Sequence, residues 1–281
     1  MSTGVLPIRL YAGYVFDLDG TLYLGEDLLP GARETVATLR EQGSRVAFLT
    51  NKPLELPAAY AAKLTELGIP ARPDDVVSST DALLRYLRLH APGARIFPVA
   101  EPLVADLLEA DGHTITDDPS RIQIVVVSFD RTFDYQKLLV AYRAVRLGAR
   151  LIATNPDPYC PTPDGGLPDC AAILAAIETA SGGRAEAVVG KPSGHMAEAV
   201  LARLGLPAGE TLLVGDRLLT DVRMAQVAGM SSALVLSGAT TRADVDASPV
   251  QPDFVISSVA DLVPAALEAI PATQPPDRSR T

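Results

Sequence analysis

The segment Asp17-Leu18-Asp19-Gly20-Thr21 places two carboxylates two residues apart, directly after a run of apolar residues. If that run is a strand, both carboxylates lie at its end and can face one pocket, where their chemistry can differ. One carboxylate can attack phosphorus while its neighbour moves a proton, provided that a cation screens their mutual repulsion. Asp-Gly is also ordinary turn chemistry, so this interpretation needs support from elsewhere in the chain.

Polar residues of complementary kinds follow three other predicted strands. Thr50 ends one strand, and Lys191 lies in GKPS after another. Asp216 and Asp221 lie in GDRLLTD after a third. The hydroxyls of Thr21 and Thr50 can donate hydrogen bonds to phosphoryl oxygens, Lys191 can neutralise charge, and carboxylates can hold a hard cation through their oxygens. Together these residues predict a phosphate site.

Alternating strands and helices are predicted at both ends of the chain. Apolar strands at 13–18 and 45–50 flank a helix at 31–42, which is a βαβ pattern. The same pattern resumes from Ala187, with later strands at 211–214, 232–236 and 254–256. Open parallel sheets bind ligands at the carboxyl ends of their strands, and the polar residues above lie at such ends.

A separate run of elements occupies the middle of the chain. Strands are predicted at 94–99, 123–129 and 149–153, with helices at 102–110 and 135–147. We therefore expect an α/β protein with a Rossmann-like parallel-sheet core formed by residues 1–79 and 186–270. An inserted α/β domain would cover residues 80–185, and the polar, proline-rich tail at 271–281 would be disordered.

Composition limits the classes of function. Hydrophobic residues make up 48% of the 281 residues, which is typical of a globular protein, and the net charge of −10 argues against nucleic-acid binding. The N-terminus lacks the pattern of a signal peptide, and no segment reaches membrane-spanning length. Cys160 and Cys170 indicate ordinary thiols in a reducing cytoplasm. A small phosphorylated metabolite is the expected partner, without nucleic acid or membrane.

Four segments, VFDLDGTLYLG, FLTNKP, VVGKPS and LLVGDRLLTDV, together resemble the haloacid dehalogenase-like hydrolase superfamily. Their order, with the inserted domain between the second and third, resembles its NagD-like, p-nitrophenyl-phosphatase branch with a large cap domain. The resemblance implies that Asp17 is the nucleophile and Asp19 the general acid and base. It also implies Mg²⁺ bound by Asp17, the backbone carbonyl of Asp19, and Asp216, with Asp221 supporting the metal shell.

Further residues take roles from the same resemblance. Thr50 matches the hydroxyl of the second motif, and Asn51 beside it is expected to shape a phosphate-binding loop. Lys191 matches the third motif and would orient Asp17 and offset charge in the transition state. Asn155 and Asp157, in TNPD, resemble a motif of the cap and are candidates for contacting substrate, although both are also plain turn residues.

Two features depart from the branch. Where its members commonly carry a small Gly-rich stretch before the cap helix, this chain has Pro168-Asp169-Cys170 after Gly165-Gly166. Where its members commonly show TNN or TNS, this chain has Thr50-Asn51-Lys52, so an extra positive charge either lies near the pocket or points into solvent. His90, His113 and His195 show no spacing typical of metal ligands.

The leading functional hypothesis is a magnesium-dependent phosphatase for small phosphate monoesters, such as a sugar phosphate or a nucleotide monophosphate. Two alternatives stay open: a phosphotransferase of the same superfamily, and a catalytically silent binding protein with this fold. A homodimer through the cap is a further expectation.

Overall fold

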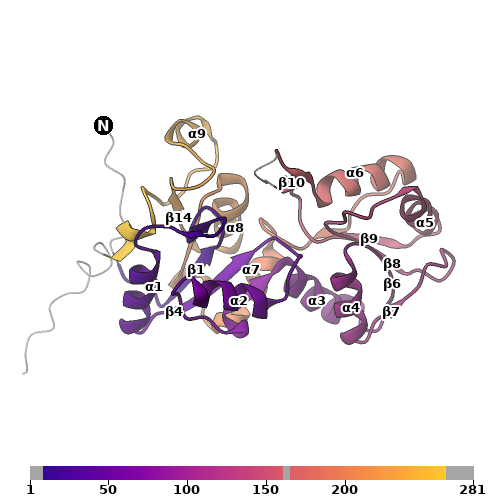
Figure 1. Ribbon diagram of the computed structural model, residues 1–281. Coiled ribbons are helices and arrows are strands. Elements are labelled where there is room, and N and C mark those ends of the chain that lie inside the picture. The colour runs from indigo at the N-terminus through magenta and orange to yellow at the C-terminus, as the bar shows by residue number, and fades with distance from the viewer. Residues whose placement is uncertain (1–8, 161–164, 264–281) are drawn as a thin grey trace, which may run out of the picture.

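The first of two parallel sheets is built from both ends of the chain. The computed structural model describes residues 9–160 and 165–263, and within them six strands form this sheet in the order β15-β14-β13-β1-β4-β5 (Figure 1). Neighbouring strands are all parallel. The strands are β1 (Gly13–Asp17), β4 (Arg45–Thr50), β5 (Val76–Ser78), β13 (Thr211–Gly215), β14 (Ser231–Val235) and β15 (Phe254–Ile256).

Burial on both faces explains why these strands are continuous apolar runs rather than alternating ones. Val15 and Leu213 pack on one face with side chains of α3, α7 and α8, whereas Phe16 and Val214 pack on the other with α1 and α2. The helices around this sheet are α1 (Ala32–Glu41), α2 (Pro57–Glu66), α3 (Ser79–His90), α7 (Gly194–Leu204), α8 (Arg223–Ala228) and α9 (Arg242–Ala247). Shorter helical segments are η1 (Pro73–Asp75), η2 (Ala208–Glu210), η3 (Leu218–Val222) and η4 (Val259–Asp261).

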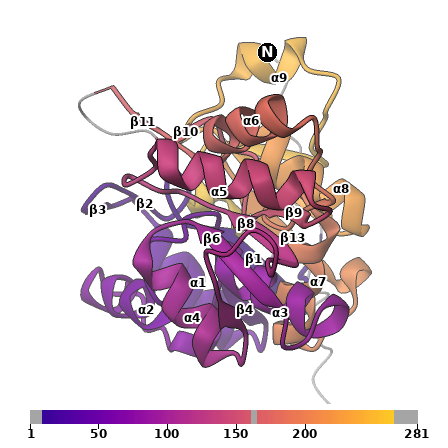
Figure 2. The ribbon, with the colours of Figure 1, turned by 90° about the vertical axis from the view of Figure 1, so that its right-hand side faces the viewer.

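The second sheet is also parallel, with the order β12-β9-β8-β6-β7. Its strands are β6 (Arg95–Val99), β7 (Thr114–Ile115), β8 (Ile124–Val127), β9 (Arg150–Ala153) and β12 (Ala187–Val188), and its helices are α4 (Pro102–Ala110), α5 (Tyr135–Arg146) and α6 (Cys170–Ser181). Figure 2 shows α5 and α6 in front of this sheet, where they bury one of its faces. Side chains of the opposite face join one continuous apolar cluster with the first sheet, so the two sheets are packed together.

Two short antiparallel hairpins complete the architecture. One pairs β2 (Tyr23–Leu24) with β3 (Asp27–Leu28), directly after the Asp17–Thr21 segment. The other pairs β10 (Tyr159–Cys160) with β11 (Leu167–Pro168) in the proline- and glycine-rich loop. Their strands of two residues are too short to show a periodic pattern, which is why the sequence did not predict them.

The predicted fold class, α/β with a Rossmann-like parallel-sheet core, is confirmed. The expected division at residues 80 and 186 stays a prediction, as does the extent of the inserted domain. The strand at Ala187 is present, but it pairs with β9 of the second sheet and does not join the first. The tail predicted to be disordered, 271–281, lies outside the described residues.

In the described residues, none of the helices combines the length and the apolar character that a membrane span requires.

The carboxyl ends of β1, β4 and β13 meet at one edge of the first sheet, because these strands are adjacent and parallel. Asp17 is the last residue of β1, Thr50 is the last of β4, and Asp216 directly follows β13. The topology therefore brings together residues that are separated by about two hundred positions in the chain.

We expect Phe48→Ala, in the middle of β4, to lower the free energy of unfolding by about 3 to 5 kcal/mol, because it leaves a cavity in a closely packed core. Phe48 is fully buried among residues of α1 and α2. Urea unfolding would measure the loss, with Leu89→Ala as the matched control, since Leu89 is 60% exposed. A similar loss in both variants would contradict this account of the core.

Candidate active site

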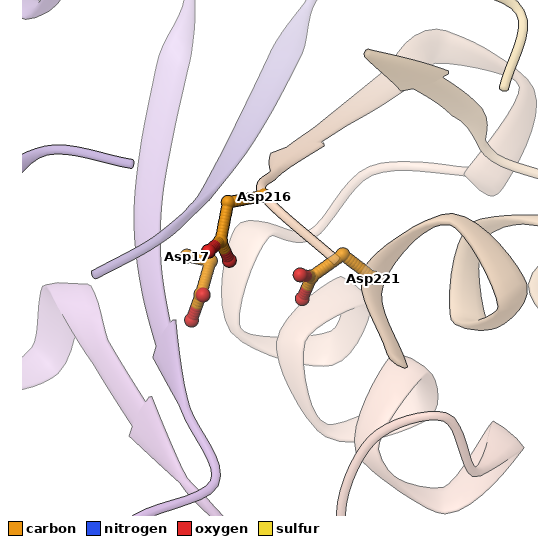
Figure 3. A group of neighbouring side chains, drawn as sticks. All are labelled: Asp17, Asp216 and Asp221. Atoms are coloured by element: carbon orange, nitrogen blue, oxygen red, sulfur yellow. The ribbon is translucent and has the colours of Figure 1, made fainter. Parts of the chain in front are cut away.

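Three carboxylates gather at the edge of the first sheet. Asp17, Asp216 and Asp221 are all buried, and each offers an oxygen that lies within 4.8 Å of the others. Figure 3 shows Asp17 and Asp216 reaching into one space from neighbouring strand ends, while Asp221 approaches from η3. Three buried acids this close repel one another, so the cluster needs positive charge.

Lys191 supplies part of that charge. Its Nζ lies 2.6 Å from Asp17 Oδ1 and 2.8 Å from Asp221 Oδ1, and its side chain is 5% exposed. The backbone N–H of Lys191 donates to Asn51 Oδ1 at 2.7 Å, which fixes the start of the side chain. One ammonium group thus lies between two carboxylates and leaves the third without a cationic partner among the described residues.

The pKa values follow from this imbalance. Burial is the largest cause that raises the pKa of Asp17 to about 8; Lys191 lowers it, while Asp221 and Asp216 raise it further. Burial and the charge of Asp221 also raise the pKa of Asp216. Burial alone would lower the pKa of Lys191, but the charges and hydrogen bonds of Asp17 and Asp221 outweigh it and raise that pKa. Without an added cation, the three carboxylates therefore do not all ionise readily at neutral pH.

The surroundings of Asp216 fit a hard cation. Its Oδ2 accepts a hydrogen bond from the Ala239 N–H at 2.7 Å, whereas its Oδ1 is buried with no hydrogen-bond partner among the described residues. Gly238 and Gly20 lie directly against this carboxylate, and a Cβ atom on either glycine would collide with it. Mg²⁺ in proteins binds to carboxylate oxygens. The partnerless oxygen of Asp216, with two further carboxylates beside it, therefore fits Mg²⁺.

Two hydroxyls lie where the sequence predicts them. Thr21 is fully buried, and its Oγ1 has no hydrogen-bond partner in the described part of the chain. The Oγ1 of Thr50 accepts a hydrogen bond from the Lys52 N–H at 3.1 Å, and no acceptor for its own hydroxyl hydrogen is found among the described residues. Both hydroxyls are therefore available to donate to an anionic ligand.

Asp19 stands apart from the cluster of three. Its carboxylate is 39% exposed, and its Oδ2 lies 2.7 Å from Lys52 Nζ. The position of Lys52, which the sequence left open, is thus beside Asp19 and not in bulk solvent. The expected contribution of Asp19 to the metal is through its backbone carbonyl, which stays a prediction.

Asn51 joins the two sheets. Its Nδ2 donates to Asp157 Oδ2 at 2.9 Å and to the Lys191 carbonyl at 3.1 Å. Asn155 Nδ2 donates to the Asn51 carbonyl at 3.4 Å, and Asn155 Oδ1 accepts from the Asp157 N–H at 2.9 Å. The contacts of Asn51 were missed from the sequence because its partners lie more than a hundred residues away in the chain. The roles of Asn155 and Asp157 toward substrate stay predictions.

Cys170 and two of the histidines make ordinary packing and hydrogen-bond contacts. Cys170 is buried, its Sγ donates to the Val127 carbonyl at 3.3 Å, and burial raises its pKa to about 11. His90 packs against Tyr86 in a tilted arrangement with ring centroids 4.5 Å apart, and His195 packs edge-to-face against the same ring with centroids 4.8 Å apart. Among the described residues, the one group with metal-ligand geometry is the aspartate cluster.

Two family descriptions match the chain. Residues 14–114 match "Haloacid dehalogenase-like hydrolase", and residues 188–262 match a second description of HAD-like hydrolases. The curated sugar-phosphatase AraL of Bacillus subtilis is 36% identical over 259 residues, which is 92% of this chain and 94% of the relative.

Solved structures agree with these matches. The 4-nitrophenylphosphatase of Thermotoga maritima is 35% identical, with a TM-score of 0.86 over 90% of this chain and 97% of the other. NagD from E. coli K-12 is 31% identical, with a TM-score of 0.81 over 91% of this chain and 98% of the other. The resemblance predicted from four short motifs is thus confirmed over nearly the whole chain: the protein belongs to the haloacid dehalogenase-like hydrolase family and is a phosphatase of its NagD-like branch.

Proposed function

We propose that the protein is a magnesium-dependent phosphatase that hydrolyses small phosphate monoesters, first of all sugar phosphates, through a phosphorylated Asp17. The observation that carries this proposal is the placement of Asp17, held by Lys191 in one buried cluster with Asp216 and Asp221. The partnerless hydroxyl of Thr21 supports a phosphate ligand beside that cluster. The similarity to a sugar phosphatase supports the choice of substrate class.

The chain's own groups account for the steps. Lys191 holds one oxygen of Asp17, and the other oxygen attacks phosphorus. As the new P–O bond forms, the bond to the leaving oxygen breaks, and Asp19 gives its proton to that oxygen. Asp19 then accepts a proton from the water that attacks phosphorus, and the bond to Asp17 breaks to release inorganic phosphate. Thr21 and Thr50 would hold phosphoryl oxygens during both transfers.

Mg²⁺ fits the cluster as described above. Asp17, Asp216 and the backbone carbonyl of Asp19 would hold it, with support from Asp221. When bound, it would offset the surplus negative charge of the site and that of the phosphoryl group.

A small substrate suits the covered site better than a phosphoprotein. The hydrogen bond from Asn51 to Asp157 supports this, because it joins the loop before β10 to the residue that directly follows β4. A covering element excludes bulk water from the reaction and restricts the size of the leaving group. A nucleotide monophosphate is the second substrate class to be tested. A cytoplasmic location and a dimer through the second sheet also stay proposals.

The direct test is release of inorganic phosphate from a panel of sugar phosphates and nucleotide monophosphates, with Mg²⁺ and with excess EDTA. The proposal expects metal-dependent release with at least one member of the panel. Appearance of a phosphorylated acceptor in place of free phosphate would favour the phosphotransferase alternative. Absence of any turnover at high enzyme concentration would contradict the proposal.

Asp17→Asn should lower the rate of phosphate release by about a thousandfold or more, because an amide cannot form the phosphoryl ester. Because the substitution is nearly isosteric, we expect the variant to stay folded, which a measurement of its melting temperature would show. Asp246→Asn, which changes an exposed carboxylate on α9, is the matched control and should retain full activity. Full activity in Asp17→Asn would remove Asp17 from its assigned role.

The raised pKa of Asp17 predicts a pH-dependent stability of the metal-free protein. Because that pKa is about 8 in the folded state, the fold keeps a proton that the unfolded chain loses above about pH 4. This proton stabilises the fold fully when the pH is below the pKa of Asp17 in the unfolded chain. The stabilisation is lost as the pH rises through the pKa of Asp17 in the folded protein.

In EDTA, the melting temperature of the wild type should therefore fall more steeply between about pH 5 and about pH 8 than that of Asp17→Asn, whose side chain does not titrate. Saturating Mg²⁺ should remove this difference, since the cation replaces the proton. Parallel melting curves for the two proteins in EDTA would speak against the raised pKa.

A further inference from the structure

Lys52 is a charged residue beside the site that the mechanism above does not use. Its Nζ lies 2.7 Å from Asp19 Oδ2, and the two side chains are 35% and 39% exposed. In the described residues, no other side chain bonds to the carboxylate of Asp19. Among these residues, this contact is thus the one side-chain hydrogen bond that restrains the carboxylate of Asp19.

The backbone of Lys52 is held on both sides. Its N–H donates to Thr50 Oγ1 at 3.1 Å, and its carbonyl accepts from the hydroxyl of Tyr60 at 3.2 Å. Tyr60 is buried in α2, and Thr50 is the last residue of β4. The side chain of Lys52 thus extends from a restrained backbone to the carboxylate of Asp19.

Asp19 is the acidic group that acts most strongly on Lys52. Burial lowers its pKa, but the charge and the hydrogen bond of Asp19 outweigh burial and raise it, with smaller contributions from Cys160 and Asp17. Its charge in turn lowers the pKa values of Cys160 and Asp169, although burial raises both overall. Lys52 directly follows Asn51, which donates a hydrogen bond to Asp157 just before hairpin β10–β11.

We propose that Lys52 is a positioning residue that holds the Asp19 carboxyl group where it can protonate the leaving oxygen. The inference rests on the proposed function, because it assigns a further residue to the same reaction. Asp19 transfers its own proton to the leaving oxygen as the bond to phosphorus breaks, and Lys52 keeps its proton throughout. Lys52 thus acts through Asp19 and not on the substrate.

The need for this positioning depends on the leaving group. A half-exposed aspartate without a partner can take several rotamers, and few of them would point at the leaving oxygen. An alkoxide leaves slowly unless it is protonated, whereas p-nitrophenolate is a stable anion and needs little help from an acid. Loss of Lys52 should therefore slow reactions of alkyl phosphates much more than the reaction of p-nitrophenyl phosphate.

The experiment compares kcat/KM for glycerol 1-phosphate and p-nitrophenyl phosphate in the wild type and in Lys52→Met. This parameter covers the steps up to phosphorylation of Asp17, so the later hydrolysis does not affect it. We expect a loss of about tenfold or more with glycerol 1-phosphate and a change of less than about threefold with p-nitrophenyl phosphate. Lys52→Arg should recover most of the loss, because a guanidinium can reach the same carboxylate.

Two controls separate positioning from general effects. Lys63→Met removes a lysine that is paired with the exposed Glu26, and it should leave kcat/KM unchanged for both substrates. In the background of Asp19→Asn, Lys52→Met should cause no further loss with glycerol 1-phosphate, because the group that it positions no longer carries a transferable proton. Lys52→Gln provides a second neutral variant, and melting temperatures show that each variant is folded.

An equal loss with both substrates, no loss with either, or additive effects in the double variant would overturn the inference while leaving the proposed function intact. If the wild type releases no phosphate in the presence of Mg²⁺ from either ester or from any member of the panel of sugar phosphates and nucleotide monophosphates, the proposed function fails and the inference fails with it.

Discussion

The contacts of Lys191 with Asp17 and Asp221 are the interaction on which the rest of the site depends. Three acids share a buried space, and Lys191 is the cation that reaches two of them. Burying a charge without a partner costs several kcal/mol, so the lysine and the acids each stabilise the ionised form of the other. The pairing also leaves a negative surplus, which under the proposed function would attract a divalent cation and, through it, a phosphate.

The fold serves this constraint by topology. Adjacent parallel strands deliver Asp17, Thr50 and Asp216 to one edge of the sheet, and the turn between β12 and α7 delivers Lys191. Asn51 links this edge to the second sheet through Asp157 and to the backbone of Lys191. The same residue thus bonds both to the loop before β10 and to the segment that carries the central lysine.

Much of this arrangement could be predicted from the sequence. Apolar runs ending in polar residues identified five of the six strands of the first sheet, and the parallel topology then implied that Asp17, Thr50 and Asp216 converge. Lys191 follows a strand of the second sheet, so its place in the site was expected from the family resemblance and not from the topology. What could not be predicted rests on contacts between distant segments. The pairing of Lys52 with Asp19 depends on the path of the chain after β4, and no local pattern distinguishes it from a solvated lysine. The pairing of β12 with β9 depends on where the chain crosses between sheets, which two apolar residues cannot specify.

The central claim is that the carboxylate of Asp17 becomes transiently phosphorylated. Rapid acid quenching during turnover, followed by mass spectrometry of the proteolytic peptides, tests it most directly. The account predicts a phosphoryl group on the peptide that contains Asp17, present only while substrate and Mg²⁺ are both supplied. Turnover with no phosphorylated peptide, or with the phosphoryl group on another residue, would contradict it.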